Sequence, residues 1–195
     1  LTNYLVGRVQ QDFNEGQTII GAMITATNRE INNDNLSFMH REAYTGGIDF
    51  KQNFMDRKYY LSYNGVFSKV IGSSEAIYNT QQAAERYFQR PNNRHATLDS
   101  TRRSLSGTGS TLAFGKSGGK IVFQTGITYR SPELDLNDAG FLISSDRINQ
   151  WTWLQYRILK PLSIFQSIRI NGNQYLGWDF GGENTSKDVN VNGHL

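Results

Sequence analysis

Long stretches of this chain alternate between apolar and polar residues, and this pattern constrains the fold more than any other feature. Between Tyr4 and Phe13, for example, Leu5, Val9 and Phe13 fall on one side of an extended chain, with Arg8 on the other. Successive side chains of a β-strand point to opposite faces of its sheet, so a period of two predicts a strand with one apolar and one polar face.

The same alternation predicts strands along most of the sequence, and several of them reach ten residues or more. Strands in globular proteins average about 5–6 residues, whereas a strand that crosses a lipid bilayer needs about 9–11. The predicted strands are residues 4–13, 17–28, 44–54, 58–70, 104–116, 120–130, 148–160, 165–180 and 188–195.

Short and long connections between these strands alternate. The short turns are residues 14–16, 55–57, 117–119 and 161–163; the long excursions are residues 29–42, 71–103, 131–147 and 181–186. Outer-membrane barrels have this connectivity, with tight turns at one end and long loops at the other. We therefore predict an all-β fold, an antiparallel meander of long strands that forms part of a transmembrane outer-membrane β-barrel. A soluble β-sandwich is the alternative.

The predicted domain covers residues 1–195, with a long loop excursion at 71–103. The sequence starts at Leu1, and the patterns at both its ends predict strands. We therefore expect a fragment of a larger barrel. The mean hydropathy of −0.53 and the lack of a run of about 20 apolar residues argue against membrane-spanning helices. A net charge of +3 is too small to indicate nucleic-acid binding, and the absence of cysteine excludes disulfides and thiolate chemistry.

Three carboxylates lie close together in the sequence at Glu133, Asp135 and Asp138. They offer oxygen ligands for calcium, but their spacing is not that of an EF-hand, and Pro132 and Asn137 favour a hydrogen-bonded loop. A glycosidase would need a matched acid and nucleophile on rigid elements, which the sequence does not supply. The histidines are far apart and are expected to be solvated; they are His40, His95 and His194. The sequence predicts no catalytic, cofactor-binding or metal-binding residue and no cofactor.

The excursion at 71–103 contains a predicted helix at 74–88, capped by Ser74 or Thr80. Folded inward, this segment would narrow the lumen and present guanidinium groups to anionic or sugar ligands. We favour a loop that folds outward or contacts a partner. The candidate ligand contacts in the lumen or loops are Arg86, Arg90, Arg130, Arg157 and Arg169.

Several segments resemble a known family: residues 3–29, 43–50, 86–91, 98–120, 129–142 and 177–182, among which "YRSPELDLNDAGFL" at 129–142 is the most specific. They are similar to the barrel domain of unknown function in Bacteroidota outer-membrane proteins that carry an N-terminal family-9-type carbohydrate-binding domain. The resemblance implies a piece of that barrel. The carbohydrate-binding domain is absent from this sequence, so no sugar-binding role is carried onto any residue.

These observations favour a non-enzymatic barrel in the outer membrane of a Gram-negative bacterium, acting as a channel or as an anchor for surface or partner proteins. Expected partners are outer-membrane lipid, other envelope proteins, and glycans through a domain outside this chain, but no nucleic acid. One alternative is a soluble β-sandwich that binds carbohydrate through exposed aromatic residues. A further alternative is a membrane-associated hydrolase that uses the acidic loop.

Overall fold

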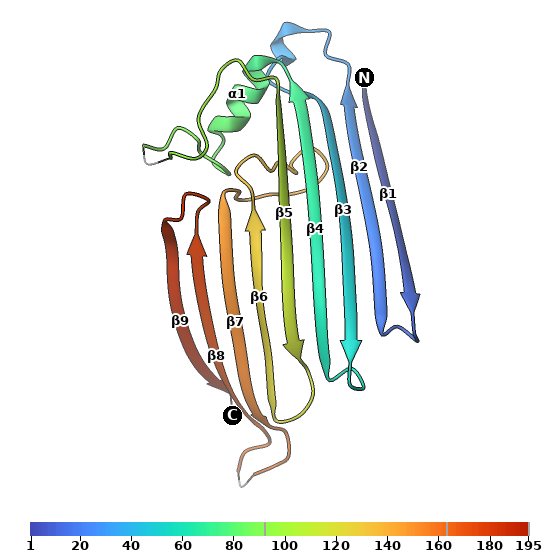
Figure 1. The fold of residues 1–195 in the computed structure, drawn as a ribbon, viewed down its shortest axis with the longest axis vertical. Helices are drawn as coiled ribbons and strands as arrows, with labels where there is room; N and C mark the ends of the chain where they lie inside the picture. Colours follow the sequence, from blue (N-terminus) through green and yellow to red (C-terminus); the bar gives the residue numbers. More distant parts are fainter. Residues whose placement is uncertain (92, 163, 195) are drawn as a thin grey trace.

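A single antiparallel sheet makes up most of the molecule in a computed structural model that describes residues 1–91, 93–162 and 164–194. Each strand pairs with its neighbours in sequence, in the order β1 to β9 (Figure 1). The strands are β1 (Thr2–Phe13), β2 (Thr18–Arg29), β3 (His40–Phe54), β4 (Tyr59–Gly72), β5 (Ser104–Lys116), β6 (Ile121–Arg130), β7 (Arg147–Ile158), β8 (Ile168–Trp178) and β9 (Asn184–His194). The predicted all-β antiparallel meander is confirmed.

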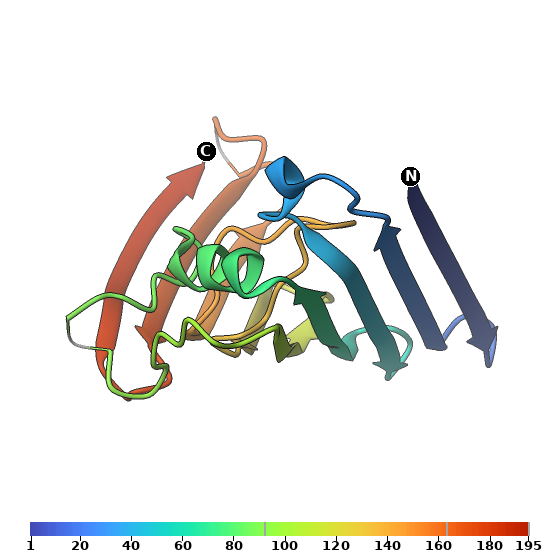
Figure 2. The ribbon, with the colours of Figure 1, turned by 90° about the horizontal axis from the view of Figure 1, so that it is seen from above.

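The sheet curves into an open trough, seen end-on in Figure 2, and β1 and β9 form its two edges. Within the described residues the sheet does not close on itself, so the fold alone does not establish the predicted barrel. None of the helices in the described part of the chain is long and apolar enough to span a membrane.

The strand register divides the side chains into two chemically different faces. Leu5 lies opposite Ala26, which lies opposite Tyr44, and this face continues as a broad apolar surface across the sheet. The other face carries mainly polar residues, such as Asn64 opposite Thr111. The loops lie over this polar face, on the concave side of the trough (Figure 2). We call the two surfaces the convex apolar face and the concave polar face.

Short turns join β1 to β2, β3 to β4 and β5 to β6 at one end of the sheet, and left-handed backbone conformations make them possible. Asn14, Glu15 and Gly16 all have positive φ in the β1–β2 turn, as do Met55 to Arg57 in the β3–β4 turn. The β7–β8 connection at the same end is longer than the predicted turn at 161–163, because β7 ends at Ile158 and β8 begins only at Ile168. The predicted turn at 161–163 includes Ser163, which lies outside the described residues.

The connection between β8 and β9 is not the predicted long excursion at 181–186. Asp179 closes it as a tight turn, because its backbone N–H donates to Glu183 and its side chain accepts from the Glu183 N–H at 2.9 Å. Strand β9 therefore begins at Asn184, earlier than predicted. Leu195, the last residue of that predicted strand, lies outside the described residues.

The excursion at 71–103, apart from Asn92, which lies outside the described residues, contains the helix α1 (Ser74–Gln82). The helix is shorter than the predicted 74–88, and its cap is Ser73, whose side chain accepts from the Ala76 N–H at 3.0 Å. It ends because the backbone of Ala83 turns to extended values.

The prediction that this excursion folds outward is wrong. Ile77 of α1 is fully buried in a cluster with Ala43, Val70 and Leu105, which lie on the concave polar face of β3, β4 and β5. Burying an isoleucine side chain contributes about 1.5–3 kcal/mol, and this gain holds the helix against the sheet.

Candidate functional site

Two long connections pack on each other and on the concave polar face, and we call them the loop layer: residues 73–91 with 93–103, and residues 131–146. Gly107 of β5 allows the close approach, because a Cβ there would collide with the backbone of Leu134. The Asp135 N–H also donates to the Ser68 hydroxyl of β4 at 3.0 Å. The loop layer is therefore fixed to the sheet by backbone contact and not only by side chains.

A buried ion pair links the two halves of the loop layer. The Arg86 guanidinium donates to the Asp135 carboxylate at 2.7 Å, and these side chains are 1% and 4% exposed. Arg86 also donates to the carbonyls of Thr80 at 2.6 Å and Leu134 at 2.9 Å. A buried charge is tolerated only when it is paired and hydrogen-bonded. The two terminal nitrogens of this guanidinium meet that requirement, whereas its buried Nε has no hydrogen-bond partner among the described residues.

A second network joins strands β2 and β3 to the loop layer through Asp138. Its carboxylate accepts from the Arg29 guanidinium and from His40 Nδ1 at 2.6 Å. The other ring nitrogen of His40 lies 2.6 Å from the Thr80 hydroxyl of α1. Burial works to raise the pKa of Asp138, but the hydrogen bonds and charges of His40 and Arg29 outweigh it and lower that pKa.

A third network surrounds Asp146, which is almost fully buried. His95 Nε2 lies 2.8 Å from its carboxylate, and Arg90 pairs with both Asp146 and Asp179. The Phe180 N–H donates to Asp146 at 3.1 Å, so this network ties the loop layer to the β8–β9 turn. The expectation that His40 and His95 are solvated is therefore wrong, because each is bound to an aspartate that the loop layer buries.

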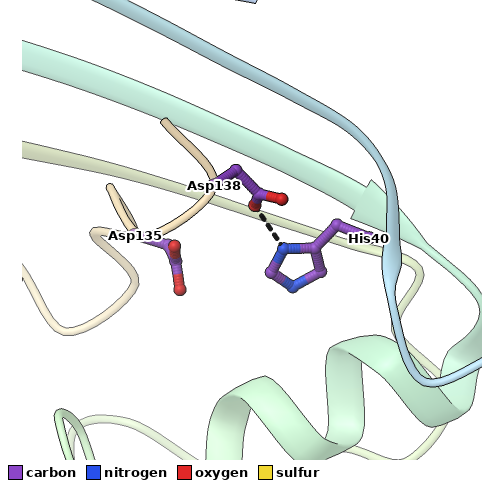
Figure 3. Close-up of side chains that lie close together, drawn as sticks. All are labelled: His40, Asp135 and Asp138. Carbon is purple, nitrogen blue, oxygen red and sulfur yellow. Dashed lines mark hydrogen bonds and ion pairs between the residues drawn. The ribbon is translucent and has the colours of Figure 1, made fainter. Parts of the chain in front are cut away.

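Two groups bring potential metal ligands within 4.8 Å of one another: His40 with Asp135 and Asp138, and His95 with Asp146 and Asp179. Figure 3 shows the first group, in which both aspartates come from residues 131–146 and His40 from the start of β3. In both groups arginines already neutralise the carboxylates. The arrangement is that of ion-pair networks, and a divalent cation would have to displace those guanidinium groups.

The three carboxylates of the predicted acidic loop point to different arginines. Glu133 pairs with Arg102 at 2.7 Å, where both side chains are 31% exposed. Asp135 pairs with Arg86, and Asp138 with Arg29. Asp135 and Asp138 come within 4.8 Å of one another beside His40, but Asp135 is only 4% exposed and each carboxylate is held by its own arginine.

The five arginines that were predicted as ligand contacts lie at different ends of the sheet. Arg86, Arg90 and Arg130 lie at the loop-layer end, where Arg130 donates to the Ser144 carbonyl at 3.4 Å. Arg157 lies at the opposite end, where it donates to the carbonyls of Ser117 and Gly119, and it is paired in register with Arg169. No single arginine-lined site contains all five.

A cavity between the loop layer and the sheet is lined by Val66, Thr111, Leu134 and Phe141, among others, and holds about 200 Å³. Ligand sites commonly occupy about 300–1,000 Å³. This space is too small for an ordinary substrate. A second hollow of about 390 Å³, lined by His95, Arg102, Glu133 and Phe180 among others, lies within that range, so the loop layer both covers the sheet and borders a hollow of ligand size.

The fold and its loop layer define a class of protein: an open antiparallel β-meander with one apolar and one polar face, covered at one end by salt-bridged loops. The chain belongs to the family described as a domain of unknown function (DUF5916), whose model matches residues 1–194. The part of the resemblance that concerns a domain of unknown function is thereby confirmed. No curated protein and no solved structure matches the chain.

Proposed function

We propose that these residues form part of the wall of a β-barrel in the outer membrane of a Gram-negative bacterium, with the convex apolar face against lipid. The observation that carries the proposal is the exposure of that face. Val9, Ile24 and Ile48 are 66%, 56% and 59% exposed. Val9 and Ile48 flank Ala22 of β2 in the register, and Ile24 lies two residues further along β2 on the same face. An apolar surface of this breadth is unfavourable in water and has to be covered by other apolar material, which the hydrocarbon core of a bilayer supplies.

A soluble sandwich would cover this surface with a second sheet. In the described ranges of the chain, all strands belong to the one meander, and the loop layer packs on the opposite face. The sandwich therefore receives no support from the arrangement of the layers.

Closure of the barrel is part of the proposal. The outer edges of β1 and β9 present backbone groups that would be unsatisfied in a bilayer, so further strands would have to pair with them. Those strands would come from the same protein or from a partner chain.

The loop layer favours an anchor or a gated channel over a permanently open pore. Its buried Arg86–Asp135 pair and the contact of Leu134 with Gly107 hold it over the concave polar face. In a closed barrel that face would line the lumen, and the loop layer would narrow one mouth. The proposed role is non-enzymatic, and the partners are lipid and other envelope proteins.

Reconstitution of the protein into liposomes tests both parts of the proposal. We expect it to float with the lipid after extraction at alkaline pH, and to give little steady conductance in planar bilayers. A variant with Gly107→Leu, which forces the loop layer away from β5, should increase the conductance. Gly172→Leu is the matched control, because a Cβ at that position meets nothing within 4 Å.

A protein that remains soluble and monodisperse without detergent, and does not associate with liposomes, would contradict the membrane assignment. A large steady conductance that Gly107→Leu leaves unchanged would contradict only the covering role of the loop layer.

A further inference from the structure

Four aromatic side chains lie on the concave polar face, away from the proposed lipid surface, and we call them the aromatic floor: Tyr60, Trp151, Trp153 and Tyr175. Trp151 of β7 is directly opposite Tyr175 of β8, and Trp153 is directly opposite Asn173. Large aromatic rings on a polar, water-facing surface are costly unless something covers them.

The ring of Tyr60 lies along the sheet instead of standing up from it. Its atoms Cζ and Oη occupy the space above Gly115, where an added Cβ would be 2.5 Å from them, and its hydroxyl bonds to Gln124. Because Tyr60 is on β4 and Gln124 is on β6, the side chain crosses the whole of β5. The Lys51 ammonium, 5.4 Å from the ring centroid, lies over one face of the ring.

The indole ring of Trp151 likewise occupies the space above a glycine, Gly126 of β6. A Cβ on Gly126 would lie 2.7 Å from Cζ2 and 3.0 Å from Cε2 of the indole. Gly126 is the register partner of Trp151 on β6, so the indole extends across that strand. Tyr60 and Trp151 therefore reach toward β6 from opposite sides, over the glycines of β5 and β6.

Side-chain amides adjoin these rings on β7, β8 and β9. Gln155 donates to Asn171 at 2.8 Å, Asn171 donates to Asn192 at 2.8 Å, and Asn173 donates to Asn190 at 3.4 Å. An amide has two N–H donors and an oxygen with two lone pairs. Asn171 is only 7% exposed and serves to hold its neighbours, whereas Gln155, Asn173, Asn190 and Asn192 keep hydrogen-bonding capacity for a ligand. The concave side chains of β7 between Asn149 and Gln155 pair in register with residues of β8, and these pair with residues of β9. Among these paired residues, Asp188 is the only charged one.

We propose that the aromatic floor and the neighbouring amides bind a neutral oligosaccharide. The C–H faces of a sugar ring are apolar and stack on flat aromatic rings, while its hydroxyl groups both donate and accept hydrogen bonds, as amides do. An anionic ligand would need fixed positive charge, and the concave side chains of β7, β8 and β9 around Trp151 and Trp153 supply none; Lys51 lies at the Tyr60 end of the aromatic floor. The proposal does not depend on the membrane assignment, because the concave polar face meets water in either case.

Tryptophan fluorescence provides the test, because the chain has 3 tryptophans and only Trp178 lies on the other face. In a Trp178→Phe background, all of the indole emission comes from the aromatic floor. The purified full chain in detergent is titrated with neutral hexasaccharides of glucose, xylose, mannose and galactose. We expect at least one of them to shift the emission in a saturable manner.

Trp151→Ala should then weaken that binding at least tenfold, and so should Trp153→Ala, which leaves both glycine contacts intact. Tyr156→Ala, on the convex apolar face, is the matched control and should change the affinity less than twofold. Circular dichroism establishes that each variant is folded.

The proposal is overturned if none of the four hexasaccharides shifts the emission. It is also overturned if a sulfated oligosaccharide binds while the neutral ones do not, or if the control weakens binding as much as Trp153→Ala does. Each of these results leaves the liposome flotation result unaffected, so failure of this inference and failure of the proposed membrane role are distinguishable.

Discussion

Removal of the Arg86 side chain should release the loop layer while the sheet stays folded. Arg86→Met deletes three hydrogen bonds, to Asp135 at 2.7 Å and to the carbonyls of Thr80 and Leu134. It also leaves the Asp135 carboxylate, 4% exposed, without its countercharge. Loss of one partner of a buried ion pair costs about 3–5 kcal/mol, which corresponds to roughly two to four orders of magnitude in an equilibrium constant.

Hydrogen exchange measures this effect directly. The amides of Leu134, Asp135 and α1 should exchange at least a hundredfold faster in Arg86→Met, while those of β3 and β4 keep their protection. Arg102→Met is the matched control: it breaks a pair of the same length to Glu133, but both side chains are 31% exposed, and such pairs contribute only about 0–1 kcal/mol. Equal exchange rates in the two variants would refute the reasoning that burial makes the Arg86 pair essential.

Two further predictions follow from the glycine contacts and from the pKa of Asp138. Gly126→Ala should destabilise the protein by about 1–3 kcal/mol in urea unfolding, because its Cβ would lie 2.7 Å from Trp151, whereas Gly172→Ala, with open space around it, should have a much smaller effect. Because the folded-state pKa of Asp138 is lowered, its stabilisation is complete above the ordinary aspartate pKa of about 3.9 and is lost as the pH falls through the folded value. The protection of the loop-layer amides, measured relative to the intrinsic exchange rate at each pH, should therefore fall in acid, and Asp138→Asn should reduce that fall; an unchanged acid response would contradict the assignment.

The strands could be predicted from the sequence because their signal is local. Alternation from Leu5 to Phe13 follows from the geometry of an extended chain and needs no knowledge of distant residues. The same reasoning placed β5 at Ser104–Lys116, the bounds that the structure has. Turn lengths were less reliable: the β8–β9 connection is short because of hydrogen bonds that Asp179 makes around the turn.

The candidate site was largely missed because its contacts are long-range. His40 and Asp138 are separated by 98 positions, and His95 and Asp146 by 51. Nothing in the local pattern around either histidine indicates its aspartate. The outward placement of the 71–103 excursion failed for the same reason, since the partners of Ile77 on the sheet lie on strands β3, β4 and β5. Arg86 and Asp135 were singled out as candidates, but their pairing with each other required the structure.

The central claim is that the convex apolar face contacts lipid, and single-cysteine labelling tests it most directly. The chain has no cysteine, so a fluorophore can be attached at one chosen position in the membrane-embedded protein. We compare Ile48 with Asp49 on β3, and Ile127 with Thr128 on β6, since neighbours on one strand point to opposite faces. We expect labels at Ile48 and Ile127 to be quenched by spin-labelled lipid, and labels at Asp49 and Thr128 by aqueous iodide. Iodide quenching at all four positions, with no alternation along either strand, would contradict this claim.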